Sequence, residues 1–335
     1  MFKMHRLSTT YKFYCCIFIF SLLILTGCSG KSDIIEMQPE DIQSSEEMAQ
    51  REELKVEELK LEEALQIEEM ITDEVQEKMR KSTITEVDLS NYFDKVNGAA
   101  VIYDPTKNDY QIYNQELALT EHSPCSTFKI ISSLIALENG IIDPDDSTRT
   151  WSGEIFWNEE WNKDINFSDA FHVSCVWYFR EVINEIGKDT IQEELNKLEY
   201  GNCDISDWEG RLNTNNSNPA LTGFWIESSL LISPKEQVEV MERIFGDNTV
   251  YSKETLEQLK QVMLLPDQNK TDISICGKTG MGMLHDIVVD SWYTGFADNA
   301  DKRIYFCVYL GETEGEEVSS AKAREIALKI IDDYL

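Results

Sequence analysis

The sequence predicts an α+β fold in which both ends of the globular region contribute strands to one antiparallel sheet packed against helices. Apolar, strand-like runs occur early and again late, at 98–104, 110–115, 272–276, 287–297 and 303–311. Between them, 150–265 has the pattern of short helices and loops, and the chain closes with a helical segment over 319–335. Strands grouped at both ends with helices between them are typical of this fold class.

The first two strands and the segment after them have clear boundaries. The turn-forming letters "PTKND" (105–109) separate the first two apolar runs and predict a hairpin. A helix is then expected over 126–138, closed by Asn139 and Gly140 as a C-terminal stop. Its apolar residues occur all round the helix rather than along one stripe, so we expect it to be central and buried.

The N-terminus has the pattern of a secretory signal. A basic start precedes "FYCCIFIFSLLILT" (13–26), which is shorter than the ~20 residues of a spanning helix. Its end, "LTGC" (25–28), resembles the lipobox of bacterial lipoproteins. That resemblance implies a signal peptide over 1–27, lipidation of Cys28 and an extracytoplasmic, membrane-anchored protein, part of which could be secreted. An uncleaved anchor is the alternative.

The residues after Cys28 predict a stalk over 28–85, ahead of a catalytic domain over 86–335. The stretch "EELKVEELKLEEAL" (52–65) consists of strong helix formers, but its apolar residues keep no sustained heptad. A charged, helical or flexible spacer is therefore favoured over a coiled coil. The net charge of −32 also argues against a nucleic-acid partner, which needs a basic surface. Nothing in the sequence fixes an oligomeric state.

Cysteine and histidine spacing gives little support to a metal cofactor. Of the eight cysteines, five fall in the predicted domain: Cys125, Cys175, Cys203, Cys276 and Cys307. They contain no C-x-x-C pair, and the four histidines form no H-x-x-x-H or Cys/His cluster. Small buried cysteines are the default interpretation. For His122 and His172 a packing or solvated role is favoured over catalysis.

The stretch "SPCSTFKIISSLIAL" (123–137) carries the first sign of chemistry. Ser126 and Lys129 are three residues apart, so on a helix their side chains can meet. A lysine at the head of such an apolar run is desolvated, which lowers its pKa toward a neutral amine able to accept a proton. Ser126 would then be a nucleophile and Lys129 its base. The alternative is a helix N-cap serine with a lysine that reaches water, as expected for the second S-x-x-K at Ser319 and Lys322.

Three further short motifs follow in order: "SCV" (174–176), "YGN" (200–202) and "KTG" (278–280). These motifs add to Ser126 and Lys129 a second serine, and a lysine beside a hydroxyl on a strand. Acyl transfer to an amide needs these parts, namely a nucleophile, a base, a proton relay and a cationic wall for an anionic substrate. Gly280 is expected to let substrate approach the strand backbone.

With these motifs in this order, residues 88–335 resemble a class D (oxacillinase-type) β-lactamase of the penicillin-recognising serine enzymes. The segments "LENGII" (137–142) and "FWIESSLLIS" (224–233) resemble the same family. The resemblance implies that Ser126 is acylated by a β-lactam and that Lys129 is carboxylated by carbon dioxide to form the general base. It implies no metal. Trp225 would donate to the carbamate, with Val176 and Ile226 shielding it.

The resemblance also assigns the remaining site residues. Ser174 would pass a proton toward the leaving nitrogen, beside Lys278. Substrate would contact four residues: Thr279, Gly280, Met281 and Arg324. The backbone N–H groups of Ser126 and Met281 would form the oxyanion hole, while Tyr200, Gly201 and Asn202 would be structural. Without the family, Trp225 could equally be a core aromatic and Arg324 a surface charge. Cys125 and Cys175 stand beside the two serines, at positions where the family usually has small residues such as alanine. We expect the site to tolerate them as small hydrophobic residues.

Three functions remain open from the sequence. The first is a β-lactamase that hydrolyses β-lactams and so confers resistance. The second is a β-lactam sensor, which is acylated and stays acylated. The third is a penicillin-binding protein acting on peptidoglycan, which usually has a polar residue where this chain has Val176. The apolar Val176 favours a retained carbamate and hence the hydrolase, because a polar group there could compete for hydrogen bonds with the lysine.

Overall fold

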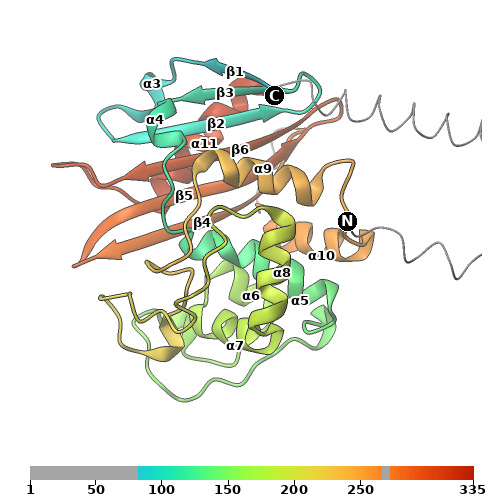
Figure 1. The fold of residues 1–335 in the computed structure, drawn as a ribbon, viewed down its shortest axis with the longest axis vertical. Helices are drawn as coiled ribbons and strands as arrows, with labels where there is room; N and C mark the ends of the chain where they lie inside the picture. Colours follow the sequence, from blue (N-terminus) through green and yellow to red (C-terminus); the bar gives the residue numbers. More distant parts are fainter. Residues whose placement is uncertain (1–81, 266–271) are drawn as a thin grey trace, which may run out of the picture. The chain divides into compact units, whose positions relative to one another are not determined.

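Both ends of the described chain contribute strands to a single six-stranded sheet. The computed structural model describes residues 82–265 and 272–335, so the predictions for the signal, for Cys28 and for most of the stalk lie outside the described residues. The strands are β1 (Thr83–Glu86), β2 (Gly98–Asp104), β3 (Asp109–Tyr113), β4 (Ser274–Leu284), β5 (Ile287–Asp298) and β6 (Arg303–Gly311). Their order is β1-β3-β2-β6-β5-β4 (Figure 1). All neighbouring pairs are antiparallel except β1 with β3, so the predicted sheet is confirmed.

Most helices lie in the chain between the two groups of strands, whereas one lies between β1 and β2 and one follows β6. The helices are α3 (Ser90–Phe93), α4 (Gln115–Ala118), α5 (Lys129–Glu138), α6 (Phe167–His172), α7 (Val176–Ile186), α8 (Lys188–Leu198), α9 (Pro234–Phe245), α10 (Lys253–Met263) and α11 (Ser320–Tyr334). Short 3-10 turns are η2 (Cys125–Phe128), η3 (Pro144–Asp146), η4 (Glu159–Trp161) and η5 (Pro219–Leu221). Helices α5 to α8 form a layer of their own beyond β4 (Figure 1). The residues of α5 from Lys129 to Leu137 are all buried, so the predicted central helix is confirmed.

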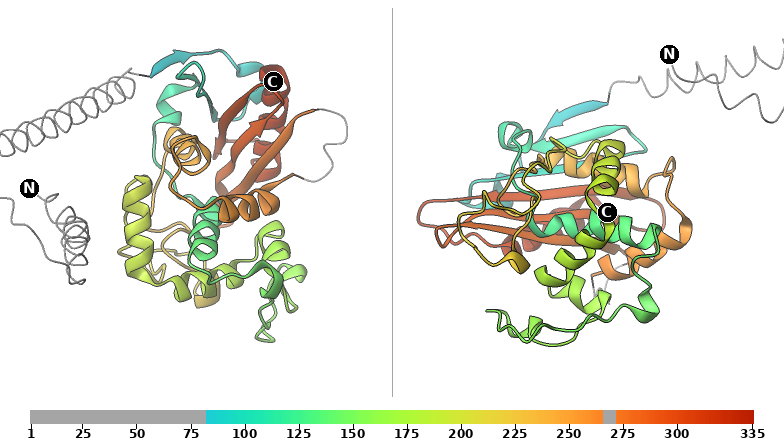
Figure 2. Two further views of the ribbon diagram at one scale, coloured as in Figure 1. Left: turned by 90° about the vertical axis from the view of Figure 1, so that its right-hand side faces the viewer. Right: turned by 60° about the horizontal axis from the view of Figure 1, so that its bottom comes forward.

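The sheet is buried on both faces, which explains the nearly continuous apolar strands. In β2, Ala99 and Val101 pack into the core shared with α5, α9 and α10, while Ala100 and Ile102 pack on the opposite face with α3 and α11. Successive side chains of a strand point to opposite faces, so both sets must be apolar when both faces are covered. Figure 2 shows helices on the two sides of the sheet.

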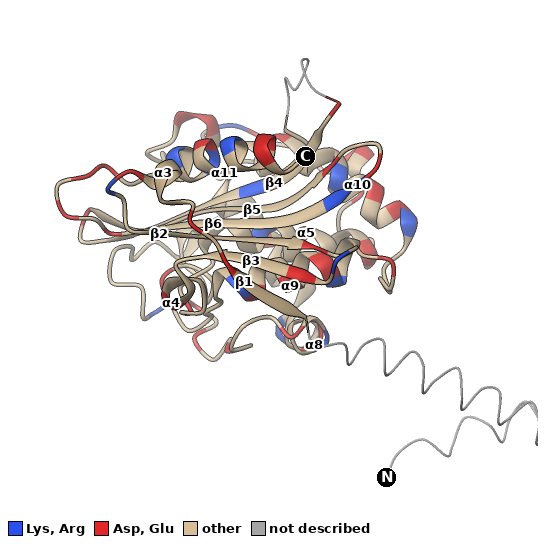
Figure 3. Ribbon diagram, turned by 90° about the horizontal axis from the view of Figure 1, so that it is seen from above, with Lys and Arg blue, Asp and Glu red and all other residues tan. Residues whose placement is uncertain are grey.

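Charged residues are concentrated on the helices and loops around the sheet. In Figure 3 the strands are almost entirely tan, whereas blue and red segments follow one another along α11 and α10. Across the described ranges, no helix has the length and apolar character needed to cross a bilayer.

The structure differs from the sequence-based elements at three points. Strand β1 begins within the residues assigned to the stalk and crosses the predicted boundary at 85/86, and all four of its residues are exposed, so no apolar alternation marks it. Strand β4 continues to Leu284, well beyond the run predicted at 272–276, because three glycines and Lys278 interrupt its apolar pattern. Ser126 lies in the 3-10 turn η2 rather than in the α-helix, which begins at Lys129.

Candidate active site

Ser126 and Lys129 meet where η2 runs into α5. The Lys129 Nζ atom donates a hydrogen bond to Ser126 Oγ at 2.9 Å. Lys129 is 1% exposed, whereas Ser126 is only partly buried and so is open to a substrate. Burial lowers the pKa of Lys129 from 10.5 to about 8, opposed by the neighbouring Cys175 and Cys125. Such a shift corresponds to roughly 3 kcal/mol against the charged form, so a useful fraction of the amine is neutral near pH 7.

Two strained backbone positions lie at this site. Cys125, directly before Ser126, has φ +48°, and Ser174 has φ +57°. Residues with a side chain rarely adopt this left-handed region, and such strain is common where a fold must aim a reactive group. The hydroxyls of Ser126 and Ser174 are therefore both presented from unusual turns rather than from regular helix.

Lys278 connects the second serine to β4. Its Nζ atom donates to Ser174 Oγ at 3.0 Å and to Thr279 O at 3.0 Å, with a longer bond of 3.3 Å to Thr279 Oγ1. Burial, followed by the charges of Lys129 and Arg324, holds the pKa of Lys278 well below its usual range. Within residues 82–265 and 272–335, neither Lys129 nor Lys278 has a carboxylate at salt-bridge distance. An anionic substrate would relieve this unpaired positive charge.

Strand β4 brings the K-T-G motif against the nucleophile's turn. A Cβ atom on Gly280 would lie 2.9 Å from Thr127 Cγ2 and 3.0 Å from Pro124 O. The glycine therefore allows β4 to pack closely on η2. The sequence predicted a glycine here for substrate approach, and this packing is an additional reason for it. Met281 follows on the strand and is 39% exposed. Arg324 is exposed on α11, with its charge close enough to Lys278 to influence its pKa.

Trp225 is completely buried beside the nucleophile's helix, with its ring hydrogen-bond donor unused. It stacks on Phe128 at 6.1 Å and meets Phe224 edge to face at 5.1 Å. Its Nε1 atom has no hydrogen-bond partner within the described part of the chain. A buried donor left unpaired costs about 1–3 kcal/mol, so an acceptor placed at this N–H would be stabilising.

The residues around Lys129 fit a carboxylated lysine on these grounds. The amine is neutral often enough to add carbon dioxide, and the Trp225 N–H is an unused donor for the resulting anion. Val176 and Ile226, both half-buried, pack against the same apolar core and offer no competing polar group. The described residues also contain no His/Cys/Asp/Glu group that could hold a metal ion.

The Y-G-N motif begins in the core at Tyr200 and reaches the surface at Asn202. Tyr200 is fully buried and meets Phe128 edge to face at 5.7 Å. Asn202 accepts from Leu231 N at 3.0 Å and donates through Nδ2 to Ser229 O at 2.9 Å. Gly201 has φ +49°, and a Cβ atom there would lie 2.0 Å from Leu231 O. These contacts fix the segment that carries Trp225, which fits a structural role.

The cysteines beside the two serines are deeply buried. Cys125 is 1% exposed and Cys175 is 0% exposed. Burial raises the pKa of Cys175 to about 11 and that of Cys125 well above its usual range, so neither is a ready thiolate. All five cysteines of the described chain are free thiols.

Sequence reasoning considered His122 only as a packing or solvated residue, and it found neither the polar cluster around His122 nor the buried Arg180. His122 Nδ1 lies 3.0 Å from Tyr309 Oη, which donates to Asp290 Oδ1 at 2.7 Å, forming a polar cluster behind η2. Burial raises the pKa of Asp290 to about 6 and lowers that of His122. Arg180, the second omission, is buried against Trp225. These partners lie far apart along the chain or on different elements, and no sequence motif marks them.

Comparison with known proteins places this geometry in a family. Residues 94–332 match the family described as "Penicillin binding protein transpeptidase domain". The regulatory protein BlaR1 of Bacillus licheniformis is 33% identical over 248 residues, covering 73% of this chain and 38% of that protein. The chain thus spans well under half of that relative. Beta-lactamase OXA-1 of Escherichia coli is 30% identical over 247 residues, covering 72% of this chain and 87% of the enzyme.

A solved structure gives the same assignment. The C-terminal domain of the Bacillus licheniformis BlaR penicillin-receptor matches with a TM-score of 0.66 and 30% identity, covering 76% of this chain and 98% of that domain. Its sequence match, the family match and the fold agree over the region that contains Ser126, Lys129 and Lys278. The chain therefore belongs to the penicillin-binding protein transpeptidase-domain family and is homologous both to class D β-lactamases and to the BlaR1 sensor.

Proposed function

We propose that the protein hydrolyses β-lactam antibiotics through an acyl-enzyme on Ser126, with carboxylated Lys129 as general base, and so confers resistance. The observation that carries the proposal is the contact of 2.9 Å between Ser126 Oγ and the Nζ atom of the buried Lys129. Burial lowers the pKa of Lys129 to about 8, so part of the amine is neutral near pH 7, and the ring N–H of the buried Trp225 has no hydrogen-bond partner among the described residues. When present, the carbamate supplies an anionic oxygen that can accept a proton.

Each step of the reaction has a residue to perform it. The substrate carboxylate binds to Thr279, Arg324 and the positive field of Lys278. Ser126 Oγ attacks the lactam carbonyl carbon and gives up its proton to the base at position 129, while backbone N–H groups of Ser126 and Met281 stabilise the oxyanion. The C–N bond then breaks, and Ser174 delivers a proton to the nitrogen. Water attacks the ester carbonyl and releases Ser126 with the opened product.

A sensor function is the second candidate, because BlaR1 is a regulatory protein that is 33% identical to this chain. In that case Ser126 would be acylated and the ester would persist. Val176 favours hydrolysis, since an apolar group beside Lys129 does not compete for its hydrogen bonds. A transpeptidase acting on peptidoglycan is a third candidate supported by the family match alone.

Intact mass spectrometry of the full-length chain in detergent separates these candidates. The protein is followed over time with a penicillin in bicarbonate buffer, together with the mass of the drug. A transient adduct with accumulating hydrolysed drug is expected, and Ser126→Ala should show no adduct. A persistent adduct with intact drug remaining would instead assign the protein to the sensor or penicillin-binding class.

We also propose that Cys28 is lipidated and anchors the domain outside the cytoplasm, on the basis of "LTGC" (25–28). Two acyl chains give stable membrane attachment, whereas one gives only marginal affinity. Fractionation of cells that express the protein should place it with the membrane. Cys28→Ser should move it to the soluble or secreted fraction, and a variant that stayed with the membrane would exclude lipidation as the anchor.

A further inference from the structure

A buried arginine lies behind Trp225, on the helix that also carries Val176. Arg180 belongs to α7, four residues after Val176, so both side chains lie on one helix face. It is 6% exposed, and its Cζ atom is 5.9 Å from the ring centroid of Trp225 and 5.9 Å from that of Trp208. A cation over an aromatic face withdraws electron density from the ring. The ring N–H of Trp225 therefore becomes a stronger hydrogen-bond donor.

The other contacts of Arg180 hold it in place. It donates through Nη1 to Trp208 O at 2.9 Å and through Nη2 to Glu209 Oε2 at 2.8 Å. Glu209 is the acidic partner, but its side chain is 51% exposed, whereas that of Arg180 is 8% exposed. Water screens the carboxylate more strongly than the guanidinium, so the net field on the Trp225 side is positive.

Packing fixes the orientation of the Trp225 ring. A Cβ atom on Gly223 would lie 2.0 Å from the Trp225 ring, so the ring packs directly on that backbone. Phe128, the residue before Lys129, stacks on the ring at 6.1 Å. The ring thus contacts both Arg180 and Phe128, and its N–H remains free of any partner among the described residues.

We propose that Arg180 is a positioning residue for the carboxylation of Lys129: its charge behind Trp225 strengthens the indole N–H and favours an anion on the lysine. This inference rests on the proposed function. In the reaction, the neutral Lys129 nitrogen forms a bond to the carbon of carbon dioxide. One C–O π pair becomes a carboxylate lone pair, and the nitrogen releases one proton to water. The site thereby changes from neutral to negative, and nearby positive charge favours the product.

The test measures carbon dioxide binding rather than activity. The full-length chain is equilibrated with ¹³C-bicarbonate at fixed pH, and the carbamate signal of Lys129 is followed by ¹³C NMR as bicarbonate is raised. We expect Arg180→Gln to weaken the apparent carbon dioxide affinity about tenfold, and Arg180→Lys, which keeps the charge, to restore most of it. Equal affinity in wild type and Arg180→Gln would overturn the inference, as would equal losses in Arg180→Gln and Arg180→Lys.

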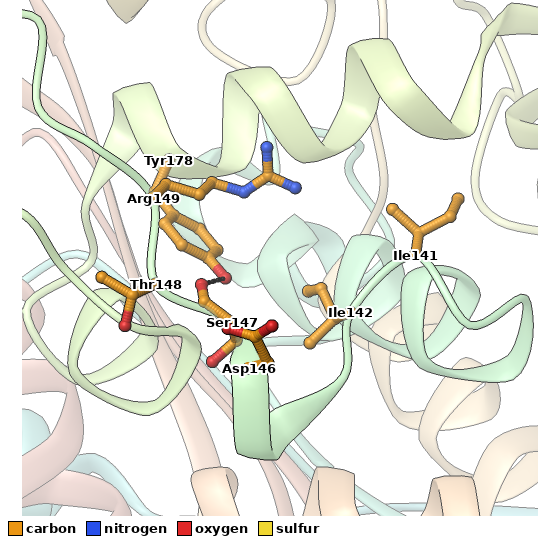
Figure 4. A pocket seen from close by; sticks show the side chains of 7 residues that line it. All are labelled: Ile141, Ile142, Asp146, Ser147, Thr148, Arg149 and Tyr178. Carbon is orange, nitrogen blue, oxygen red and sulfur yellow. Dashed lines mark hydrogen bonds between the residues drawn. The ribbon is translucent and has the colours of Figure 1, made fainter.

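Arg149 provides a matched control. It also lies beside an aromatic residue of α7, Tyr178 (Figure 4), with its Cζ atom 5.1 Å from that ring's centroid. It pairs with Glu185 at 2.6 Å. Its aromatic and ionic partners are Tyr178, Glu181 and Glu185 and not Trp225, so Arg149→Gln should leave the carbon dioxide affinity unchanged. A loss equal to that of Arg180→Gln would mean that removing any arginine packed on an aromatic ring near α7 has this effect, which would overturn the assigned role.

A second variant keeps the test decisive if Arg180→Gln fails to fold. Glu209→Gln removes the screened negative charge and leaves Arg180 in place, so carbon dioxide should bind more tightly than in wild type. Unchanged or weaker binding would contradict the inference. Wild-type protein without any carbamate signal would refute the base proposed at Lys129 together with this inference. A wild-type signal with no effect of Arg180 and Glu209 would refute the inference alone.

Discussion

Lys129→Ala should lower the rate of deacylation by about 10³-fold or more and leave a trapped acyl-enzyme on Ser126. General base catalysis contributes about 10²–10⁴-fold, and Lys129 Nζ is the basic group that contacts Ser126 Oγ, at 2.9 Å. Deacylation suffers most because water, unlike an activated lactam, brings no ring strain to help it. Stopped-flow acylation followed by mass spectrometry of the adduct separates the two steps.

The second S-x-x-K of the chain supplies the control for this variant. Lys322 follows Ser319 at the same spacing, but it lies on α11, where the serine caps the helix through a bond of 3.2 Å from Lys322 N. Its side chain is partly exposed, so Lys322→Ala should leave turnover unchanged. Wild-type deacylation in Lys129→Ala would refute the role given to Lys129.

The sequence predicted the sheet best where burial is complete. Strands β2 and β6 match the predicted runs 98–104 and 303–311, because both faces are covered and every residue between the first and the last of each strand is apolar. At the edges of the sheet this signal weakens. In β1 all residues are exposed, and in β4 the glycines that permit contact with η2 interrupt the strand pattern. The glycines that hide β4 from sequence-based prediction are thus the residues that let it approach the turn carrying Ser126.

Within the candidate site, sequence reasoning worked for local pairs and failed for distant ones. Ser126 with Lys129, and Lys278 with Thr279, are close in sequence, and the first pair follows from helical spacing. The bond between Lys278 and Ser174 joins residues 104 positions apart, and only the family resemblance placed both at one site. Arg180 belongs to no sequence motif, because its role depends on contact with Trp225, which lies on another segment of the chain.

Burial connects the stability of this site to its chemistry. Lys129 and Lys278 are both buried without carboxylate partners among the described residues, so each charged form destabilises the fold. For Lys129 the folded pKa of about 8 lies below the unfolded value, and the penalty is therefore complete below pH 8 and disappears as pH rises toward 10.5. Under the proposed carboxylation, the addition of carbon dioxide would remove this positive charge at lower pH and with it the penalty.

Trp225→Phe should lower β-lactam turnover about 10²-fold at ambient carbon dioxide, with partial recovery in saturating bicarbonate. The substitution removes a single N–H donor and keeps an aromatic ring, so the carbamate loses a hydrogen bond to a charged group, worth roughly 1.5–3 kcal/mol. Bicarbonate restores occupancy by mass action, although the base stays less well held. Turnover measured across a bicarbonate series gives both the loss and the recovery.

Trp177→Phe is the matched control, because Trp177 is also buried but its Nε1 atom already donates to Trp161 O at 2.9 Å. Removing that donor leaves a buried carbonyl unpaired and should reduce the free energy of unfolding by about 1–3 kcal/mol, with no change in bicarbonate dependence. Trp225→Phe should have the opposite profile, since its N–H has no protein partner within the described residues. If Trp225→Phe kept full turnover at every bicarbonate concentration, the buried indole would be a packing residue, and the carbamate would have to be held by other groups.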